Sequence, residues 1–376
     1  MASPFRLFTK RVFIIANIVL VFFFLLSCLV PYLNPRGWWL IAFLGLAFPF
    51  LLLLNLLFIA GWLIILRPRY ALISGIALIF SIKNISVFFA FNNPNVFDYN
   101  KEPGTLRVAS WNVARFIELK KNNNKGSQKR LKMFELLRQQ NADILCLQEF
   151  HTSTDTNYYD NITPIQKELG YPYYYFTFDE DGDNHYYSSI IFSRYPFADT
   201  GRIRYPRPSL PEVLMYADIL FNGDTIRVYT THLQSNQLGK TDYYRISKIK
   251  TAGDSLVTNS RSIMGKIKRG FIGRSYQADV VSEVTDVSPH PYLLCADLND
   301  VPNSYTYSRV RGDLQDAFLK KGFGIGRTYT GLAPTLRIDY IFADNHFRVK
   351  QLNRVVKFLS DHFMLVADVE LKKSKK

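Results

Sequence analysis

Apolar residues divide the chain into two parts of different character. Residues 12–33 are apolar over about the length that a bilayer core requires, and a second apolar run follows at 38–66. A third and weaker run at 70–91 contains Lys83. The pattern therefore predicts a membrane anchor over residues 1–91 with about three transmembrane helices, one for each run.

The first apolar run has two other interpretations. One is a cleaved signal peptide, although the run is longer than the usual apolar region of such a peptide. The other is a lipoprotein cleavage site, which the sequence "LLSC" at 25–28 loosely resembles. The long apolar sequence that continues beyond both positions favours an anchor.

Basic residues set the expected orientation of this anchor. Three of them lie within 6–11, and Arg67 and Arg69 separate the second and third runs, so the positive-inside rule places both regions in the cytoplasm. If the third run crosses the membrane, the rest of the chain lies on the non-cytoplasmic side. If that run is re-entrant, the rest is cytoplasmic, and Lys83 favours this alternative because a charge inside the bilayer is costly. We expect three spans, a multi-pass integral membrane protein and a C-terminal domain outside the cytoplasm.

The remainder of the chain has the pattern of a globular domain. Residues 92–104 are rich in Asn and Pro and are interpreted as a linker, and the domain is expected over 105–372. Many strands with fewer helices between them indicate an α/β sandwich of sheets covered by helices. The expected strands are 105–113, 142–150, 186–196, a hairpin at 212–233 that turns at Asn222-Gly223, 291–299, 336–344, 347–356 and 363–371, and the expected helices are 128–140 and 275–287.

Polar side chains stand at the ends of these strands. The strand ends of a rigid scaffold are places where a site can be built accurately. Carboxylate and amide oxygens are ligands that suit Mg²⁺ or Mn²⁺. Each residue alone has a structural explanation as a turn cap, an ion-pair partner or a buried core histidine, and only the recurrence of the pattern favours a site. The residues are Asn112, Glu149, His232, Asp297, Asn299, Asp339, Asp361 and His362.

Charge and cysteine content add little to this picture. The chain has a formal net charge of +15; residues 1–91 contain seven Lys or Arg and no Asp or Glu, which leaves +8 for the rest. A basic surface suits a phosphate-bearing substrate or an anionic membrane, and it is equally compatible with a surface that binds nothing. The basic stretch 261–274 is compatible with contact to lipid headgroups or to a nucleic-acid backbone, and equally with a solvated helix or loop. The three cysteines do not suggest a disulfide framework, and Cys146 and Cys295 are expected to be small core residues.

The strand-end motifs, taken in order, resemble the endonuclease/exonuclease/phosphatase family. They are "SWNV", "LQE", "THL", "ADLND", "RIDYIF" and "SDH", and they span 105 to about 370. The resemblance implies a four-layered α/β sandwich of the deoxyribonuclease I type, with its site where the two sheets end. One departure is Ala296, where the family usually has glycine before the aspartate.

The resemblance also implies a metal site. Glu149 resembles the principal metal carboxylate of the family, and Asn112 resembles the amide beside the metal. Asp361 resembles a further carboxylate near it. The implied ion is Mg²⁺ or Mn²⁺.

Catalytic roles follow from the same resemblance. Asp297 resembles the carboxylate that orients and deprotonates the attacking water, and Asn299 resembles its partner in positioning the phosphate. His362 resembles the histidine that contacts the scissile phosphate, with Asp339 behind it. His232 resembles a second histidine that is typical of the nuclease, sphingomyelinase and phosphatase branches.

These observations predict a membrane-anchored, Mg²⁺-dependent phosphoesterase. Nucleic acid is the default substrate and makes a nuclease the first expectation. A phospholipid or sphingomyelin phosphodiesterase is one alternative, and a catalytically silent binding protein with the same fold is another. The expected partners are the lipid bilayer and a phosphoester substrate, and no obligate protein partner is inferred.

Overall fold

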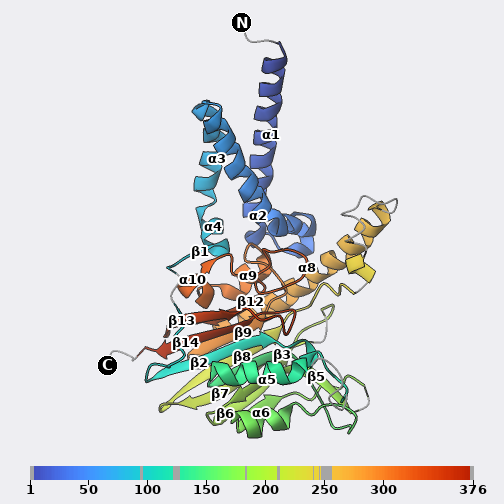
Figure 1. Ribbon diagram of the computed structural model, residues 1–376, viewed down its shortest axis with the longest axis vertical. Helices are drawn as coiled ribbons and strands as arrows, with labels where there is room; N and C mark the ends of the chain where they lie inside the picture. The colour runs from blue at the N-terminus through green and yellow to red at the C-terminus, as the bar shows by residue number, and fades with distance from the viewer. Residues whose placement is uncertain are drawn as a thin grey trace.

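The chain folds into an apolar helical segment and a two-sheet α/β sandwich that lies at one end of it (Figure 1). The helical segment, residues 4–88, is called the anchor after its predicted role. The structure is a computed structural model that describes residues 4–93, 96–121, 128–182, 184–209, 212–239, 241–244, 246 and 256–372. Residues 94 and 95 of the expected linker lie outside this description. The fold class therefore agrees with the prediction.

Two helices of the anchor are long and apolar enough to cross a membrane, as the first two apolar runs predict. They are α1 (Pro4–Cys28) and α2 (Pro35–Ile64), joined by the short 3₁₀ helix η1 (Val30–Tyr32). Pro35 begins α2 directly after Asn34, whose side chain accepts a hydrogen bond from the Arg36 amide.

The third apolar run is not one straight helix. It forms α3 (Pro68–Phe80) and α4 (Ile82–Phe88), which meet at an angle of 66°. At 1.5 Å per residue, α3 rises only about 20 Å, which is shorter than the hydrocarbon core of a bilayer. The last residues of the run form strand β1 (Ala90–Phe91), which pairs with β11 (Phe323–Gly324) of the sandwich. Lys83 lies over the Tyr32 ring at the end of the anchor that meets the sandwich, and not near the middle of a span.

The described residues of the sandwich form two six-stranded sheets. One sheet contains, in spatial order, β13 (Phe347–Val355), β14 (Met364–Leu371), β2 (Thr105–Asn112), β3 (Ile144–Ser153), β5 (His185–Ser193) and β4 (Tyr173–Phe176). The other contains β10 (Gln315–Asp316), β12 (Asp339–Ala343), β9 (Tyr292–Asp297), β8 (Asp224–His232), β7 (Val213–Phe221) and β6 (Phe197–Arg204). The pairs β2–β3 and β8–β9 are parallel, and the other pairs are antiparallel.

Three apolar layers separate the sheets and helices. Side chains of both sheets fill the central layer, which includes the buried Cys146 and Cys295 as expected. The first sheet packs on its outer face against α5 (Lys129–Gln140) and α6 (Ile162–Leu169). The second packs against α8 (Leu256–Asp286) and α9 (Tyr305–Arg311), and α10 (Ala317–Lys321) lies nearby. The two sheets pack face to face, and helices pack with their apolar stripes on the outer faces, which gives four layers.

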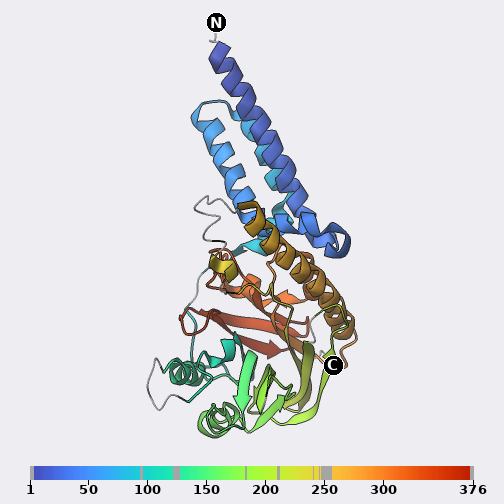
Figure 2. The same cartoon turned by 90° about the vertical axis from the view of Figure 1, so that its right-hand side faces the viewer.

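Helix α8 is much longer than the sequence predicts. The expected helix covers only 275–287, whereas α8 begins at Leu256 and includes the basic stretch 261–274. Its middle part packs on α2, where the Phe271 and Phe43 rings lie 5.3 Å apart. Figure 2 shows α8 running along the sandwich towards the anchor.

The anchor docks on the sandwich through a loop that follows β9. The Asn303 side chain donates to the Ser27 carbonyl at 2.9 Å and accepts from Asn84 Nδ2 at 2.7 Å. Arg36 of α2 pairs with Asp279 of α8. Asn303 is 2% exposed, so this contact is buried and places the loop against α1, α2 and α4.

Candidate active site

The two parallel strand pairs bring four polar residues to the same edge of the sandwich. Asn112 ends β2 beside β3, which carries Glu149, and His232 ends β8 directly opposite Asp297 of β9. Asp339 begins the antiparallel strand β12 and is also opposite Asp297. All the strand-end residues singled out in the sequence therefore fall at one end of the two sheets, and Asp361 is the one among them that is exposed.

Asn112 links the two sheets at the centre of the site. Its Nδ2 donates to Glu149 Oε1 and to Asp297 Oδ2, both at 3.0 Å. Asp297 is completely buried, and its Oδ1 accepts from the backbone N–H of Asn299 at 2.9 Å. The Glu149 side chain keeps 28% exposure. Asp297 is therefore fixed in orientation by two donors, whereas Glu149 remains open to a ligand.

Two backbone positions at the site are strained. Glu149 has φ = 50° and Asn299 has φ = 51°, in the left-handed region that non-glycine residues seldom adopt. Glu149 coincides with a shift of register between β3 and β5. Such irregularities redirect a side chain and are common next to functional sites.

His362 and Asp339 form a buried pair. His362 Nδ1 lies 2.9 and 3.0 Å from the two Asp339 oxygens and 3.8 Å from Asp297 Oδ2. Burial alone lowers the pKa of His362, but the Asp339 and Asp297 carboxylates outweigh it and raise the pKa to about 10. The ring is therefore an imidazolium at neutral pH, with Nε2 as its second donor.

A second histidine–carboxylate pair contains a residue that the sequence interpretation missed. His232 Nδ1 lies 3.2 Å from Glu212 Oε2. Its Nε2 lies 3.0 Å from Nδ2 of the Asn299 side chain. Burial lowers the pKa of His232, and the Glu212, Asp297 and Glu149 charges raise it by more, so the net direction is upward. Burial and the Glu149 and Asp297 charges also raise the pKa of Glu212 itself to about 7.

The position of Glu212 was implicit in the predicted hairpin. In the β7–β8 pairing Leu214 is opposite Thr231, so Val213 is opposite His232 and Glu212 lies one residue beyond it. The hairpin turn at Asn222-Gly223 determines that register. The carboxylate was overlooked because it precedes its strand and does not end one.

Two acidic residues of the motifs form hydrogen bonds with groups outside the Asn112 network. Asp361 is exposed, and its carboxylate accepts from Ser360 at 3.2 Å. Asp300, the second acid of "ADLND", is buried and pairs with Arg274 Nε at 3.1 Å and with Thr306 at 2.9 Å. Asp300 therefore holds the loop after β9 on α8, and the buried Arg274 of the basic stretch is used internally.

Aromatic and basic side chains line the site. Arg115 pairs with Asp181 at 2.8 Å and lies over the Tyr187 ring at 4.2 Å. Burial, together with the Glu149 and Glu212 charges, raises the pKa of Tyr187, which places this ring beside the carboxylates. On the opposite side, the Tyr329 ring lies 4.9 Å from His362.

The oxygen ligands of the site suit a hard divalent cation. Glu149 and Asp297 accept from the same Asn112 amide, and Glu212 lies close by at His232 Nδ1, so three carboxylates gather in this site. Asp297, Asp339 and His362 also bring ligand atoms within 4.8 Å of one another. That trio is buried and internally hydrogen-bonded, so the partly exposed Glu149 carboxylate is the more accessible ligand. The roles of Asn112 and Asp361 as ligands stay predictions.

Comparisons with known families match both parts of the chain. The model of the endonuclease/exonuclease/phosphatase family matches residues 109–362. A domain of unknown function (DUF8431) matches residues 10–88, which correspond to the anchor. A comparison with curated protein sequences gave no significant match.

Solved structures resemble the sandwich. An endonuclease/exonuclease/phosphatase from Beutenbergia cavernae superposes with a TM-score of 0.50 at 21% identity, covering 71% of this chain and 72% of that one. A family protein from Leptotrichia buccalis gives 0.50 at 14% identity, covering 71% and 100%. The human nocturnin catalytic domain with bound sulfate gives 0.49 at 18% identity, covering 72% and 94%.

Proposed function

Because the chain belongs to the endonuclease/exonuclease/phosphatase family, whose fold supports hydrolysis of phosphoester bonds, we propose that it is a membrane-anchored, Mg²⁺- or Mn²⁺-dependent phosphodiesterase. The observation that carries the proposal is the buried network in which Asn112 holds Glu149 and Asp297 together between two histidine–carboxylate pairs. A scaffold without catalysis has no need for such a concentration of buried charge.

In the proposed mechanism, Asp297 orients and deprotonates the attacking water. Its two oxygens are held by Asn112 and Asn299, so it is positioned before the substrate arrives. Charge on the non-bridging phosphate oxygens is compensated by the His362 imidazolium, which Asp339 keeps charged and oriented.

Other residues complete this arrangement. His232, oriented by Glu212, faces the same phosphate from the opposite sheet. Glu149, with Asn112 and Asp361, would hold the divalent cation, which supplies Lewis-acid stabilisation of the phosphate. A phosphodiester is the first expectation and a phosphomonoester is the alternative, because a cation and an imidazolium can stabilise the charge of either phosphate group.

The natural substrate is tested best with full-length protein. We expect Mg²⁺-dependent release of product from one class in a panel of DNA, RNA, sphingomyelin vesicles and phosphoinositide vesicles, with no release in EDTA. Nucleic acid is the first expectation, and a lipid headgroup is the second because the anchor keeps the site close to a bilayer. A lack of hydrolysis of all four classes with either Mg²⁺ or Mn²⁺ would contradict the proposal.

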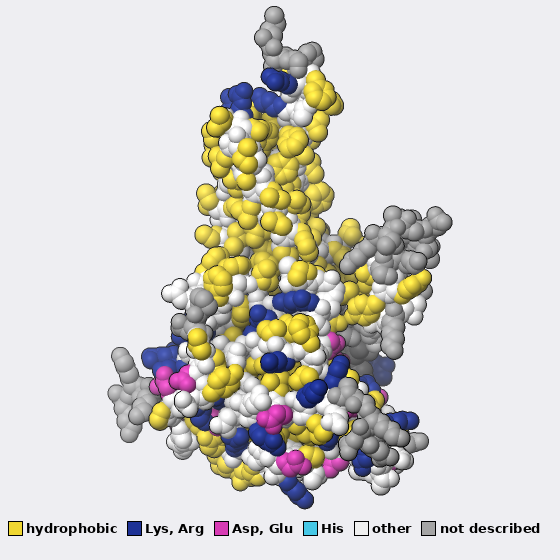
Figure 3. All heavy atoms as spheres, in the orientation of Figure 1, with side chains coloured by type: hydrophobic (Ala, Val, Ile, Leu, Met, Phe, Trp, Pro, Cys, Tyr) yellow, Lys and Arg dark blue, Asp and Glu magenta, His cyan; other side chains and the backbone are white. Residues whose placement is uncertain are grey.

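The proposed location of the sandwich is the non-cytoplasmic side. Figure 3 shows dark-blue side chains at the end of the anchor far from the sandwich, where the N-terminus of α1 and the α2–α3 connection lie. The sandwich contacts the opposite end: Asn34, between α1 and α2, donates to Tyr305 at 3.2 Å. The positive-inside rule favours a cytoplasmic position for the basic end, and therefore an external one for the sandwich.

A further inference from the structure

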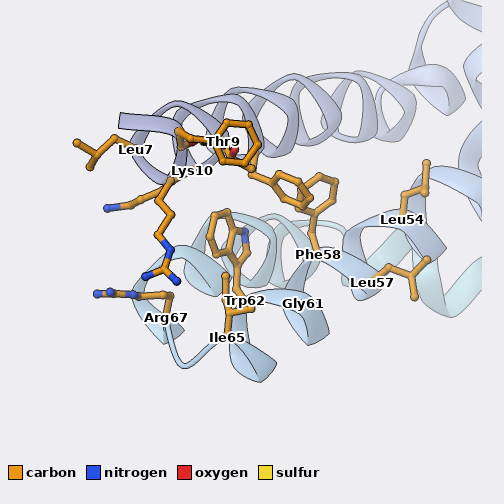
Figure 4. A pocket seen from close by; sticks show the side chains of 13 residues that line it. Leu7, Thr9, Lys10, Leu54, Leu57, Phe58, Gly61, Trp62, Ile65 and Arg67 are labelled. Carbon is orange, nitrogen blue, oxygen red and sulfur yellow. Dashed lines mark hydrogen bonds between the residues drawn. The ribbon is translucent and has the colours of Figure 1, made fainter. Parts of the chain in front are cut away.

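A groove opens between α1 and α2 at the far end of the anchor, away from the catalytic site. It has a volume of about 1040 Å³, comparable with the upper range of ligand pockets. Apolar side chains of both helices form its walls, among them Phe13, Leu57, Phe58 and Ile65. Figure 4 shows these helices on the two sides of the groove.

Three cations lie at one end of this groove. Arg6 and Lys10 of α1 and Arg67, which follows α2, line it together, and Figure 4 shows Lys10 and Arg67 reaching towards the same end. The first 91 residues contain seven Lys or Arg and no Asp or Glu, so this segment carries a net positive charge. The charge and shape therefore match an amphiphile with an anionic head and an apolar tail.

Trp62 provides an independent observation. Its side chain lines the groove, is 3% exposed, and has an indole Nε1–H without a hydrogen-bond partner among the described residues. A buried indole donor normally finds an acceptor. An ester carbonyl of a lipid, placed between the head and the chains, is an acceptor of the required kind.

We propose that this groove binds one anionic phospholipid. Its phosphate lies among Arg6, Lys10 and Arg67, its ester carbonyl accepts from Trp62, and its acyl chains cover Phe13 and Phe58. The lipid belongs to the leaflet at the far end of the anchor, so it is not the substrate of the catalytic site. The proposal depends on membrane insertion of α1 and α2 and not on hydrolysis, so the two are tested by separate measurements.

The test is a titration of the purified full-length protein in detergent, followed by native mass spectrometry. The probes are phosphatidylglycerol and phosphatidylcholine with the same acyl chains. We expect tighter binding of phosphatidylglycerol, a loss of about fivefold in affinity for each of Arg6→Gln, Lys10→Gln and Arg67→Gln, and about a hundredfold for the triple variant. Trp62→Phe should weaken both lipids equally.

Arg69→Gln is the matched control. Arg69 lies two residues from Arg67, over the Tyr70 ring, and does not line the groove, so its variant should bind phosphatidylglycerol like the wild type. A second readout is thermal unfolding, in which phosphatidylglycerol should raise the melting temperature of wild type and Arg69→Gln but not of the triple variant. Equal affinity for the two lipids, or equal losses in Arg69→Gln and Arg67→Gln, would overturn the proposal.

Discussion

Glu212 shows how one residue completes a site that sequence motifs describe only in part. It lies 3.2 Å from His232 Nδ1, and the pair mirrors the 2.9 Å contact between His362 and Asp339 on the other side of Asp297. Each carboxylate fixes the tautomer and orientation of its histidine. We therefore propose that Glu212 is a positioning residue that acts through His232.

We expect Glu212→Gln to lower kcat by about 10- to 100-fold with little change in KM. The amide keeps the shape of the side chain but not its charge. Because burial, with the Glu149 and Asp297 charges, raises the pKa of Glu212 to about 7, the wild-type carboxylate ionises as the pH rises through 7, and the loss should grow over that range. Initial rates on bis-p-nitrophenyl phosphate across a range of pH check this. Glu212→Asp, which retains the charge, serves as the control and should recover part of the rate. A folded Glu212→Gln variant with unchanged kcat at every pH would remove this residue from the account.

Most of the residues that the structure brings together in the candidate site could be found in the sequence because each ends a buried strand. Asn112, His232 and Asp297 follow apolar runs whose parallel pairing brings their ends together. The pattern could not show that the Asp300 side chain turns inward to Arg274. In the sequence, an acidic residue of the loop after a strand looks the same whether its side chain is buried or exposed. Nor could the pattern show that Asp361 is exposed, since that depends on how the chain enters β14.

At the scale of elements, the anchor is part of the folded catalytic unit. The loop that carries Asn299 continues to Asn303, which is held by Ser27 of α1 and Asn84 of α4. These partners are more than 200 residues apart in the chain, and single asparagines resemble ordinary caps, so the sequence gives no sign of the contact. The sequence also did not predict the length of α8. This helix contains three glycines, which are poor helix formers, and one of them, Gly273, gives Gln234 the space to approach.

Gly45 of α2 offers a test of this docking. A Cβ atom at Gly45 would lie 2.5 Å from the Asn303 carbonyl oxygen, so Gly45→Ala should force the helix and the loop apart. We expect a loss of about 1–3 kcal/mol in stability and a lower melting temperature of the full-length protein.

Gly75→Ala in α3 is the matched control, because a Cβ at Gly75 meets no atom within 4 Å. Alanine is the better helix former, so this variant should be as stable as the wild type or slightly more so. Equal melting temperatures for the two variants would show that α2 does not press on the loop.

At the scale of the whole molecule, the arrangement of charge predicts the side of the membrane on which the sandwich lies. The basic ends of α1 and α2 point away from the sandwich, and the α1–α2 connection contacts it. We expect a C-terminal alkaline phosphatase fusion to be active and a C-terminal green fluorescent protein fusion to be dark.

The break between α3 and α4 was not apparent from hydropathy, because both helices are apolar and only their 66° angle distinguishes them from one span.

If the opposite fusion results were obtained, with an active green fluorescent protein and an inactive alkaline phosphatase, the sandwich would face the cytoplasm. A cytosolic nucleic acid or an inner-leaflet lipid would then become the leading substrate.

We propose that the strand-end network hydrolyses phosphodiesters with Asp297 as the base. The most direct measurement is the rate of bis-p-nitrophenyl phosphate hydrolysis by purified full-length protein with Mg²⁺, with EDTA, and in the Asp297→Asn variant. We expect turnover with Mg²⁺, none with EDTA, and a loss of at least about 100-fold in a variant that keeps the melting temperature of the wild type. Wild-type turnover by a folded Asp297→Asn protein, or turnover that EDTA leaves unchanged, would contradict the account.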